Sequence, residues 1–234
     1  MIDILQTYWL DLLIGGYPNG PLGGLAMTMI IAVTGIVLAF PLGVLLALAD
    51  LSERRWLSRS SGAVITFVRG VPLLMFIFWI YFALPVVTGL SVSGSVTLIV
   101  ALVIFESAYI SQIVKAGILA LPRGQREAAE SLSMTPFQVN MKIILPQAIF
   151  NMTPSLISQL SSAVKDTSLG YIINATEITF ATAQINSILL TKPLEIFGIL
   201  AIVFFVICTS LTGLANILER RLGRSQSIAL ANVR

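Results

Sequence analysis

Two charged residues, Arg69 and Glu106, stand alone inside long runs of apolar residues. A charge at membrane depth costs about 2.5 to 3.5 kcal/mol on insertion scales, so each is expected to have a partner or a ligand. Counted along helices from the ends of the two runs, the two residues lie at similar depths. This placement predicts a structural ion pair between them or direct contact with a ligand, and both can hold together. Tyr109, one turn after Glu106, is expected to extend the same site.

Polar side chains form a second candidate site. They recur at three- and four-residue spacing on one helix face, at Asn151, Ser155, Ser158, Ser162 and Lys165 or Asp166. Leucine and valine occupy the opposite face. Pro154 interrupts the backbone hydrogen bonds beside this stripe, as happens where discontinuous helices line a solute site. We expect the stripe to line a translocation pathway; helix packing through small hydroxyl residues is the alternative.

The residue types exclude several other chemistries. The sequence contains no histidine, which is the commonest metal ligand and proton relay. Its one cysteine, Cys208, lies in an apolar run, where a packing role is expected. No GxxxxGK[ST] phosphate loop occurs, so the chain is not expected to hydrolyse nucleotide. Scattered carboxylates without histidine also disfavour an intramembrane enzyme. No catalytic residue, metal ion or cofactor of its own is therefore expected.

Composition places these residues in a membrane protein. Of the 234 residues, 56% are hydrophobic and 11% are charged, whereas soluble domains carry roughly 25% charged residues. The mean hydropathy is +0.93. One domain core cannot bury this much apolar surface, so lipid must solvate part of it. The net charge of +3 fits basic loops of a membrane protein, and no nucleic-acid partner is expected.

The expected fold is an all-α membrane protein with about five transmembrane helices in a single domain, residues 1–234. The spans are predicted at about 22–48, 61–85, 95–118, 147–165 and 195–218. A short interfacial helix is expected before them, because the N-terminal apolar segment lacks the basic residues that precede a cleaved signal peptide. No second half resembles the first, so a transporter of this size would need partners.

The distribution of basic residues predicts the orientation. With Arg69 left out as buried, eleven lysines and arginines fall in the loops and tail of one side, and only Lys165 and Lys192 on the other. Positively charged loops are retained in the cytoplasm. The N-terminus is therefore expected outside and the C-terminus in the cytoplasm.

The cytoplasmic connection 119–146 carries the most informative local pattern. A short helix is predicted in GQREAAESL, and three of its residues are expected on one face: Ala128, Ala129 and Leu132. A capping box with proline at the first helical position is expected to begin a second helix: Thr135, Pro136 and Gln138. Pro146 is expected to end it. Many solvated amphipathic loops look similar, and that is the alternative interpretation.

The spacing in this loop resembles the EAA loop of permease subunits of type I ATP-binding-cassette importers. That pattern is E-A-A, three residues, Gly, nine residues and I-x-L-P, and it is matched by Glu127, Ala128, Ala129, Ile143, Leu145 and Pro146. Ser133 stands where the family has glycine, and serine adopts a left-handed backbone less readily. RGVPLL from Arg69 and KDTSLGYII from Lys165 are similar to segments of the polar amino-acid branch. The resemblance runs from about Leu25 to Leu222.

The resemblance implies roles for two sets of residues. ATPase coupling would involve Gly124, Glu127, Ala128, Ala129, Leu132 and Ser133. The substrate pathway would involve Arg69, Glu106, Tyr109, Ser155, Ser158, Ser162, Asp166, Thr167 and Ser168. The implied setting is the bacterial inner membrane and its lipid. The implied partners are a second permease subunit, identical or paralogous, two ATPase subunits that bind ATP and Mg²⁺, and an external solute-binding protein.

The implied substrate is a small polar amino acid, with glutamate or aspartate favoured by Arg69 and by a general likeness to permeases for those substrates. The alternatives are a permease for another small polar solute and a channel-forming subunit without ATPase coupling. A channel would show passive flux without ATPase partners.

Overall fold

In the computed structural model, residues 2–231 are described, with side chains for all of these except 123 and 221–231. The described residues form helices and two isolated bridges, which confirms the all-α prediction. In chain order the elements are α1 (Ile2–Ile14), α2 (Gly24–Asp50), α3 (Arg55–Gly70), α4 (Leu73–Phe78), the π-helix η1 (Trp79–Ala83), α5 (Leu84–Thr88), α6 (Gly94–Leu119), α7 (Arg123–Ser131), α8 (Pro136–Val139), the π-helix η2 (Asn140–Ile144), α9 (Leu145–Asp166), the 3-10 helix η3 (Thr167–Ile173), α10 (Ile178–Leu189) and α11 (Pro193–Ala231).

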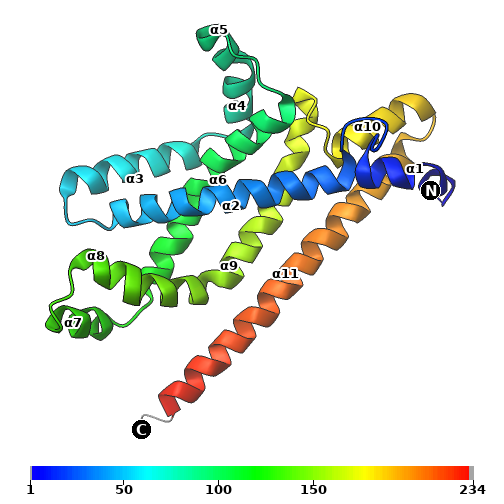
Figure 1. Cartoon of the computed structure of the whole chain (residues 1–234). Helices are drawn as coiled ribbons and strands as arrows, with labels where there is room; N and C mark the ends of the chain where they lie inside the picture. The colour runs from blue at the N-terminus through cyan, green and yellow to red at the C-terminus, as the bar shows by residue number, and fades with distance from the viewer. Residues whose placement is uncertain (1, 232–234) are drawn as a thin grey trace.

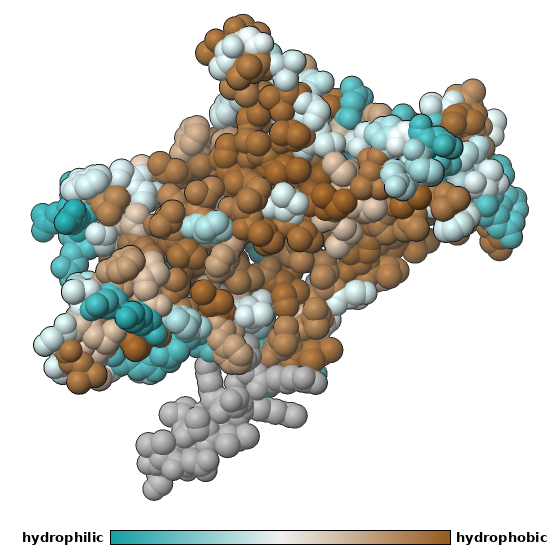
Figure 2. All heavy atoms as spheres, viewed as in Figure 1, coloured by the Kyte–Doolittle hydropathy of each residue, from teal (hydrophilic) through white to brown (hydrophobic). Residues whose placement is uncertain are grey.

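Three of the described helices are long and apolar enough to cross a membrane: α2, α6 and the part of α11 over Pro193–Arg220. A fourth candidate is α3 together with Leu73–Thr88, two segments bent by 97°. The span expected at 147–165 lies inside α9, whose polar residues keep it below the hydropathy of the other spans. Hydrophobic side chains cover the middle of the molecule and hydrophilic ones gather at its two ends (Figure 2), as expected for a protein embedded in lipid.

Helices α2 and α6 pack closely because small residues lie where they cross (Figure 1). A Cβ added at Gly43 would stand 2.6 Å from the Ile110 side chain, and one added at Gly35 would stand 3.2 Å from Leu102. Small residues let membrane helices approach closely and gain van der Waals contact. This pair therefore forms the rigid centre that positions the other helices.

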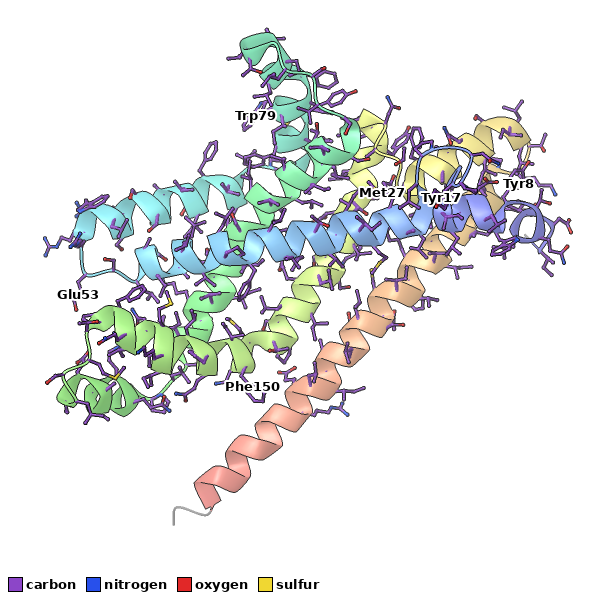
Figure 3. The ribbon with its side chains drawn as sticks, in the orientation of Figure 1. Tyr8, Tyr17, Met27, Glu53, Trp79 and Phe150 are labelled. Atoms are coloured by element: carbon purple, nitrogen blue, oxygen red, sulfur yellow. The ribbon has the colours of Figure 1, made fainter. Side chains whose placement is uncertain are left out.

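The bent second span leaves the bundle at residues 70–72. Pro72 precedes α4, and the residue before a proline is disfavoured in the helical conformation, so α3 ends there. The arm formed by α4, η1 and α5 projects from the body, with Trp79 along it (Figures 1 and 3). At its base Phe76 packs edge-to-face against Trp79 and Phe105.

The N-terminal helix packs at the other end of the molecule. Its residues Ile4 and Leu12 join a buried cluster with α10 and α11, and Tyr8 and Tyr17 lie at this end (Figure 3). Glu177 caps α10, because its carboxylate accepts hydrogen bonds from the N–H groups of Thr179 and Phe180, at 2.7 and 2.8 Å. Burial raises the pKa of the Glu177 carboxyl to about 7, against the effect of these two hydrogen bonds.

The connection between α6 and α9 contains the predicted capping box. The Thr135 hydroxyl accepts from the Gln138 N–H, and the Gln138 side chain accepts from the Thr135 N–H. The prediction that Pro146 ends the second helix is wrong: α8 continues through η2 into α9, and Pro146 lies in the first turn of α9. A proline has no N–H group to donate, and the π-helix η2 directly before it supplies the local adjustment of backbone hydrogen bonds by which a helix tolerates a proline.

Candidate functional site

Glu106 lies fully buried in α6 and faces α9. Its Oε2 accepts a hydrogen bond of 2.6 Å from Nε2 of Gln159, and its Oε1 has no hydrogen-bond partner among the described residues. Buried polar groups are usually satisfied, and an orphaned one needs an explanation such as an absent ligand. The carboxylate therefore has one oxygen able to accept a hydrogen bond from a cationic or donor group.

Arg69 does not pair with Glu106, so the predicted ion pair is wrong. Its guanidinium carbon lies 5.1 Å from the centre of the Tyr109 ring, a cation–π geometry. Depth counting gives the height of a residue in the membrane but not the side of the helix on which it lies. Tyr109 faces α3, whereas Glu106 faces α9. The structure therefore brings Arg69 of α3 together with Tyr109 of α6, while Glu106, one turn before Tyr109, contacts Gln159 of α9.

The polar stripe lies on an open side of α9. Ser155 and Ser158 are exposed and Ser162 is half-buried, while Val164 is fully buried on the opposite face against α2 and α11. Asp166 ends α9 close enough to Glu106 for the two carboxylates to interact electrostatically. The Glu106 carboxylate is buried between α6 and α9, and Gln159 of α9 contacts it, whereas the polar stripe lies on the open side of α9.

The residues after α9 form the tight turn η3. Thr167 is buried and its hydroxyl donates to the Val164 carbonyl at 2.7 Å, so it is used in the helix end. Ser168 is half-buried in η3. Of the three residues predicted from the KDTSLGYII segment, Asp166 is the one that interacts electrostatically with Glu106.

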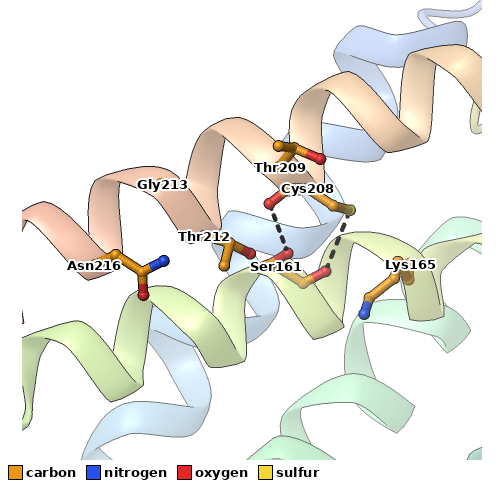
Figure 4. Close-up of a pocket in the computed structure, with 7 residues that line it drawn as sticks. All are labelled: Ser161, Lys165, Cys208, Thr209, Thr212, Gly213 and Asn216. Atoms are coloured by element: carbon orange, nitrogen blue, oxygen red, sulfur yellow. Dashed lines mark hydrogen bonds between the residues drawn. The ribbon is translucent and has the colours of Figure 1, made fainter.

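Helix α11 supplies a second polar wall that the sequence interpretation missed. A cavity of about 310 Å³ lies between α9 and α11 (Figure 4), lined by Ser161, Lys165, Cys208, Thr209, Thr212, Gly213 and Asn216. A smaller cavity of about 130 Å³ adjoins it at Asn216 and is lined also by Ser155, Ser158 and Glu219. The spacing of Thr209, Thr212 and Asn216 within an apolar run was the available signal, because it places all three on one helical face.

The expected packing role of Cys208 fits this geometry. Its thiol donates to the Ser161 carbonyl at 3.7 Å, and the Ser161 hydroxyl donates to the Cys208 carbonyl at 3.5 Å. These contacts fasten α9 to α11 at one end of the groove (Figure 4).

Helix α7 forms where the short helix is predicted, but the residues expected on one of its faces differ in burial. Glu127 and Ala128 are exposed and Leu132 is 79% exposed, whereas Ala129 is 5% exposed inside a core cluster with Ala47 and Ile118. The expectation that Ala128, Ala129 and Leu132 share one face is wrong, because Ala129 is buried and the other two are exposed. A helix this short needs an anchor, and Ala129 supplies it by joining the apolar cluster that also includes Ala47 of α2 and Ile118 of α6.

Further contacts hold the loop. Nη2 of Arg126 donates to Oδ1 of Asn140 at 2.8 Å, which ties α7 to η2. Ser133 has φ of 59°, the left-handed conformation that favours glycine, and it lies in the turn between α7 and α8. Gly124, by contrast, is exposed in α7 without a positive φ.

The sequence profile of one protein family matches residues 39–224, and its description is binding-protein-dependent transport system inner membrane component. The chain belongs to this family. The resemblance drawn from the EAA-type loop is thereby confirmed, and the family places the chain as a membrane component of a transport system.

Curated relatives fit the same assignment. The glutamate/aspartate import permease protein GltK of Escherichia coli O6:H1 is 36% identical over 207 residues, which cover 86% of this chain and 92% of the relative. The inner membrane amino-acid ABC transporter permease protein YhdY of Escherichia coli K12 is 35% identical over 203 residues, 85% of this chain. The chain spans 55% of YhdY, about half of its length.

A solved structure has the same fold. The crystal structure of an amino acid ABC transporter with histidines aligns with a TM-score of 0.76 and 30% sequence identity, over 85% of this chain and 92% of that chain. The MetNI methionine ABC transporter, at 23% identity and a TM-score of 0.64, shares the fold.

Proposed function

We propose that the chain is the permease subunit of an ATP-driven importer for polar amino acids in the bacterial inner membrane. The observation that carries the proposal is the polar face of α9 and α11 beside the Glu106 carboxylate. Polar and charged side chains at membrane depth face protein or water rather than lipid. A water-filled path completed by a second permease subunit meets that requirement.

The charges of this face suit a zwitterion. Oε1 of Glu106 is available to accept from a substrate ammonium group, and the nearby Asp166 carboxylate adds to the negative potential. Arg69, at the end of α3, suits a carboxylate because guanidinium groups bind carboxylates through two parallel hydrogen bonds. Glutamate or aspartate is the proposed substrate, supported by the 36% identity to the glutamate/aspartate import permease protein GltK.

The loop supplies the proposed coupling surface. Its exposed residues Glu127, Ala128 and Leu132 would contact an ATPase subunit that binds ATP and Mg²⁺. An external binding protein would deliver the solute at the opposite end, near α1 and α10. In this arrangement the N-terminus lies outside and the C-terminus in the cytoplasm, as the basic residues indicate.

The test is uptake by vesicles in which the chain is reconstituted with an ATPase and a binding protein encoded beside it. Labelled glutamate should accumulate only with ATP and binding protein, and Glu106→Gln should abolish uptake while the complex still assembles. Glu53→Gln, which removes an exposed carboxylate on the α2–α3 loop, is the matched control and should transport normally. Passive flux without ATP would favour the channel, and uptake of other solutes but no amino acid would reject the substrate class.

A further inference from the structure

An ion pair joins α2 and α6 at the end of the molecule proposed to face the cytoplasm. The Asp50 carboxylate, in the last turn of α2, lies 2.7 Å from Nζ of Lys115 in α6. Their side chains are 12% and 34% exposed, so the pair is partly shielded from water. It sits at the junction from which the α2–α3 loop projects, where Glu53 marks the exposed part of the turn (Figure 3).

Asp50 is unfavourably placed for its own helix. Carboxylates at a helix C-terminus oppose the helix dipole, because that end carries partial negative charge. Its contacts to the other helices are favourable, however. The Ser58 hydroxyl donates to the Asp50 carbonyl at 2.9 Å, and a Cβ added at Gly62 would stand 3.4 Å from Oδ1 of Asp50. The residue therefore contacts α3 on one side and α6 on another.

The ion pair lies directly beside the anchor of the loop. Asp50 follows Ala47 by three residues, and Lys115 precedes Ile118 by three, so each lies one helical turn from a member of the cluster that buries Ala129. The loop helix α7 belongs, through Ala129, to the same apolar cluster as the ends of α2 and α6, at the level at which the charges join those two helices. A displacement of α7 would therefore be passed first to the ends of α2 and α6, where the ion pair joins them.

The far end of α3 reaches the polar site. Helix α3 has 16 residues, a length of about 24 Å at 1.5 Å per residue. Ser58 and Gly62 lie at Asp50, and Arg69 lies over Tyr109, one turn from Glu106. One straight helix therefore connects the junction beside the loop with the residues proposed to contact the solute.

We infer that Asp50 and Lys115 are positioning residues for coupling: their ion pair holds α2 to α6, and α3 is fastened to α2 beside it through Ser58, so that a displacement of α7 moves Arg69 relative to the solute path. This inference rests on the proposed function, since it needs an ATPase that acts on α7. Neither residue touches solute. Without the ion pair, the ATPase would still hydrolyse ATP, but fewer of its hydrolysis cycles would lead to import of a solute molecule.

The experiment compares four forms in reconstituted vesicles: wild type, Asp50→Asn, Lys115→Gln and the exchanged pair Asp50→Lys with Lys115→Asp. The readout is the number of ATP molecules hydrolysed per glutamate imported, beside the amount of ATPase that copurifies. Each single variant should assemble normally and raise that ratio at least fivefold. The exchanged pair should return it to within twofold of wild type, and Glu53→Gln should leave it unchanged.

Two outcomes would overturn the inference. The first is an unchanged ratio in both single variants, which would make the ion pair purely structural. The second is an exchanged pair that assembles but stays uncoupled, which would mean that the attraction between the charges is not what matters. Should Asp50→Asn fail to accumulate, Lys115→Arg keeps the ion pair and must keep the wild-type ratio. Failure of the wild type to import any amino acid would instead reject the proposed function, so the two failures are distinct.

Discussion

The guanidinium of Arg69 lies over the Tyr109 ring, 5.1 Å from its centre, while the Glu106 carboxylate one turn away accepts from Gln159. Two opposite charges thus lie in one neighbourhood without neutralising each other. A structural ion pair would leave both groups occupied. The arrangement found leaves an arginine held by an aromatic face and a buried carboxylate with one oxygen that accepts no hydrogen bond from the described residues, which is suited to a ligand that carries both charges.

This arrangement predicts how substitutions at Arg69 and Glu106 combine. Glu106→Gln should keep the amount of protein in the membrane near wild type, because an amide oxygen can still accept from Gln159 and a buried charge is removed. Arg69→Gln should lower it modestly. The double variant should show the sum of the two effects, since no ion pair is broken. Immunoblots of membranes check the amounts, and uptake should be lost in all three variants.

Recovery of protein in the double variant above the level of Arg69→Gln would contradict this prediction. It would show that the two charges interact strongly, as partners in a buried pair do, where loss of one partner costs about 3 to 5 kcal/mol.

A second prediction concerns the ring itself. Tyr109→Phe keeps an aromatic face beneath Arg69 and should leave the thermal midpoint of the purified protein within about 1 °C, a small change for a fold of this size. Tyr109→Leu keeps a large apolar side chain but loses the cation–π contact, at a cost of about 0.5 to 2 kcal/mol. Melting curves in detergent distinguish the two variants. Equal midpoints would show that Arg69 gains nothing from the ring.

The sequence predicted the elements of the fold better than their relative rotation. Hydropathy located α2, α6 and α11, and the short-range rules for helix starts located the Thr135 capping box. Those rules use only neighbouring residues. Whether Ala129 packs inward, or whether Glu106 faces α9 rather than α3, depends on how helices far apart in sequence meet. Depth along a helix cannot supply that information.

The groove beside α11 shows the same limit. Thr209, Thr212 and Asn216 lie in a run apolar enough to be assigned as a span. Their polarity is explained by Ser158 and Lys165 of α9, which line the same two cavities. A polar stripe on one helix indicates a functional face. Only a second stripe packed near it defines a cavity, and that pairing is set by tertiary structure.

A third prediction follows from the backbone at Ser133. A left-handed conformation costs an L-residue roughly 1 to 2 kcal/mol, and glycine avoids this cost. Glycine also has a greater conformational entropy in the unfolded state, which offsets part of the gain in folding stability. Ser133→Gly should therefore stabilise the protein by about 0.5 to 1 kcal/mol. Ser131→Gly, the same change inside α7, should destabilise it by about as much. Chemical unfolding in detergent checks both, and a loss of stability in Ser133→Gly would contradict the prediction.

A fourth prediction tests the orientation. In a Cys208→Ala background, single cysteines at Asn19 or Ser91 should react with an impermeant thiol reagent added to intact cells. Cysteines at Glu53 or Ser131 should react only after permeabilisation. All four positions are exposed, so accessibility is decided by the side of the membrane. Labelling of Ser131→Cys from outside would overturn both the orientation and the docking of an ATPase on α7.

The last prediction separates the two alanines of the loop, which differ in burial although they are adjacent. Ala128 is exposed, whereas Ala129 is 5% exposed in the cluster with Ala47 and Ile118. Ala129→Trp overpacks that cluster, which typically costs about 1 to 3 kcal/mol, and should lower the amount of folded protein. Ala128→Trp should leave that amount unchanged but block close approach of an ATPase subunit.

The measurements are fluorescence size-exclusion profiles for folding, and ATPase activity stimulated by the loaded binding protein for coupling. Ala128→Ser, a small change at the same exposed position, should keep wild-type stimulation and serves as the control. If Ala128→Trp retained full stimulation, the outward face of α7 could not be the docking surface. If Ala129→Trp accumulated normally and lost only stimulation, Ala129 would contact the ATPase rather than its own chain.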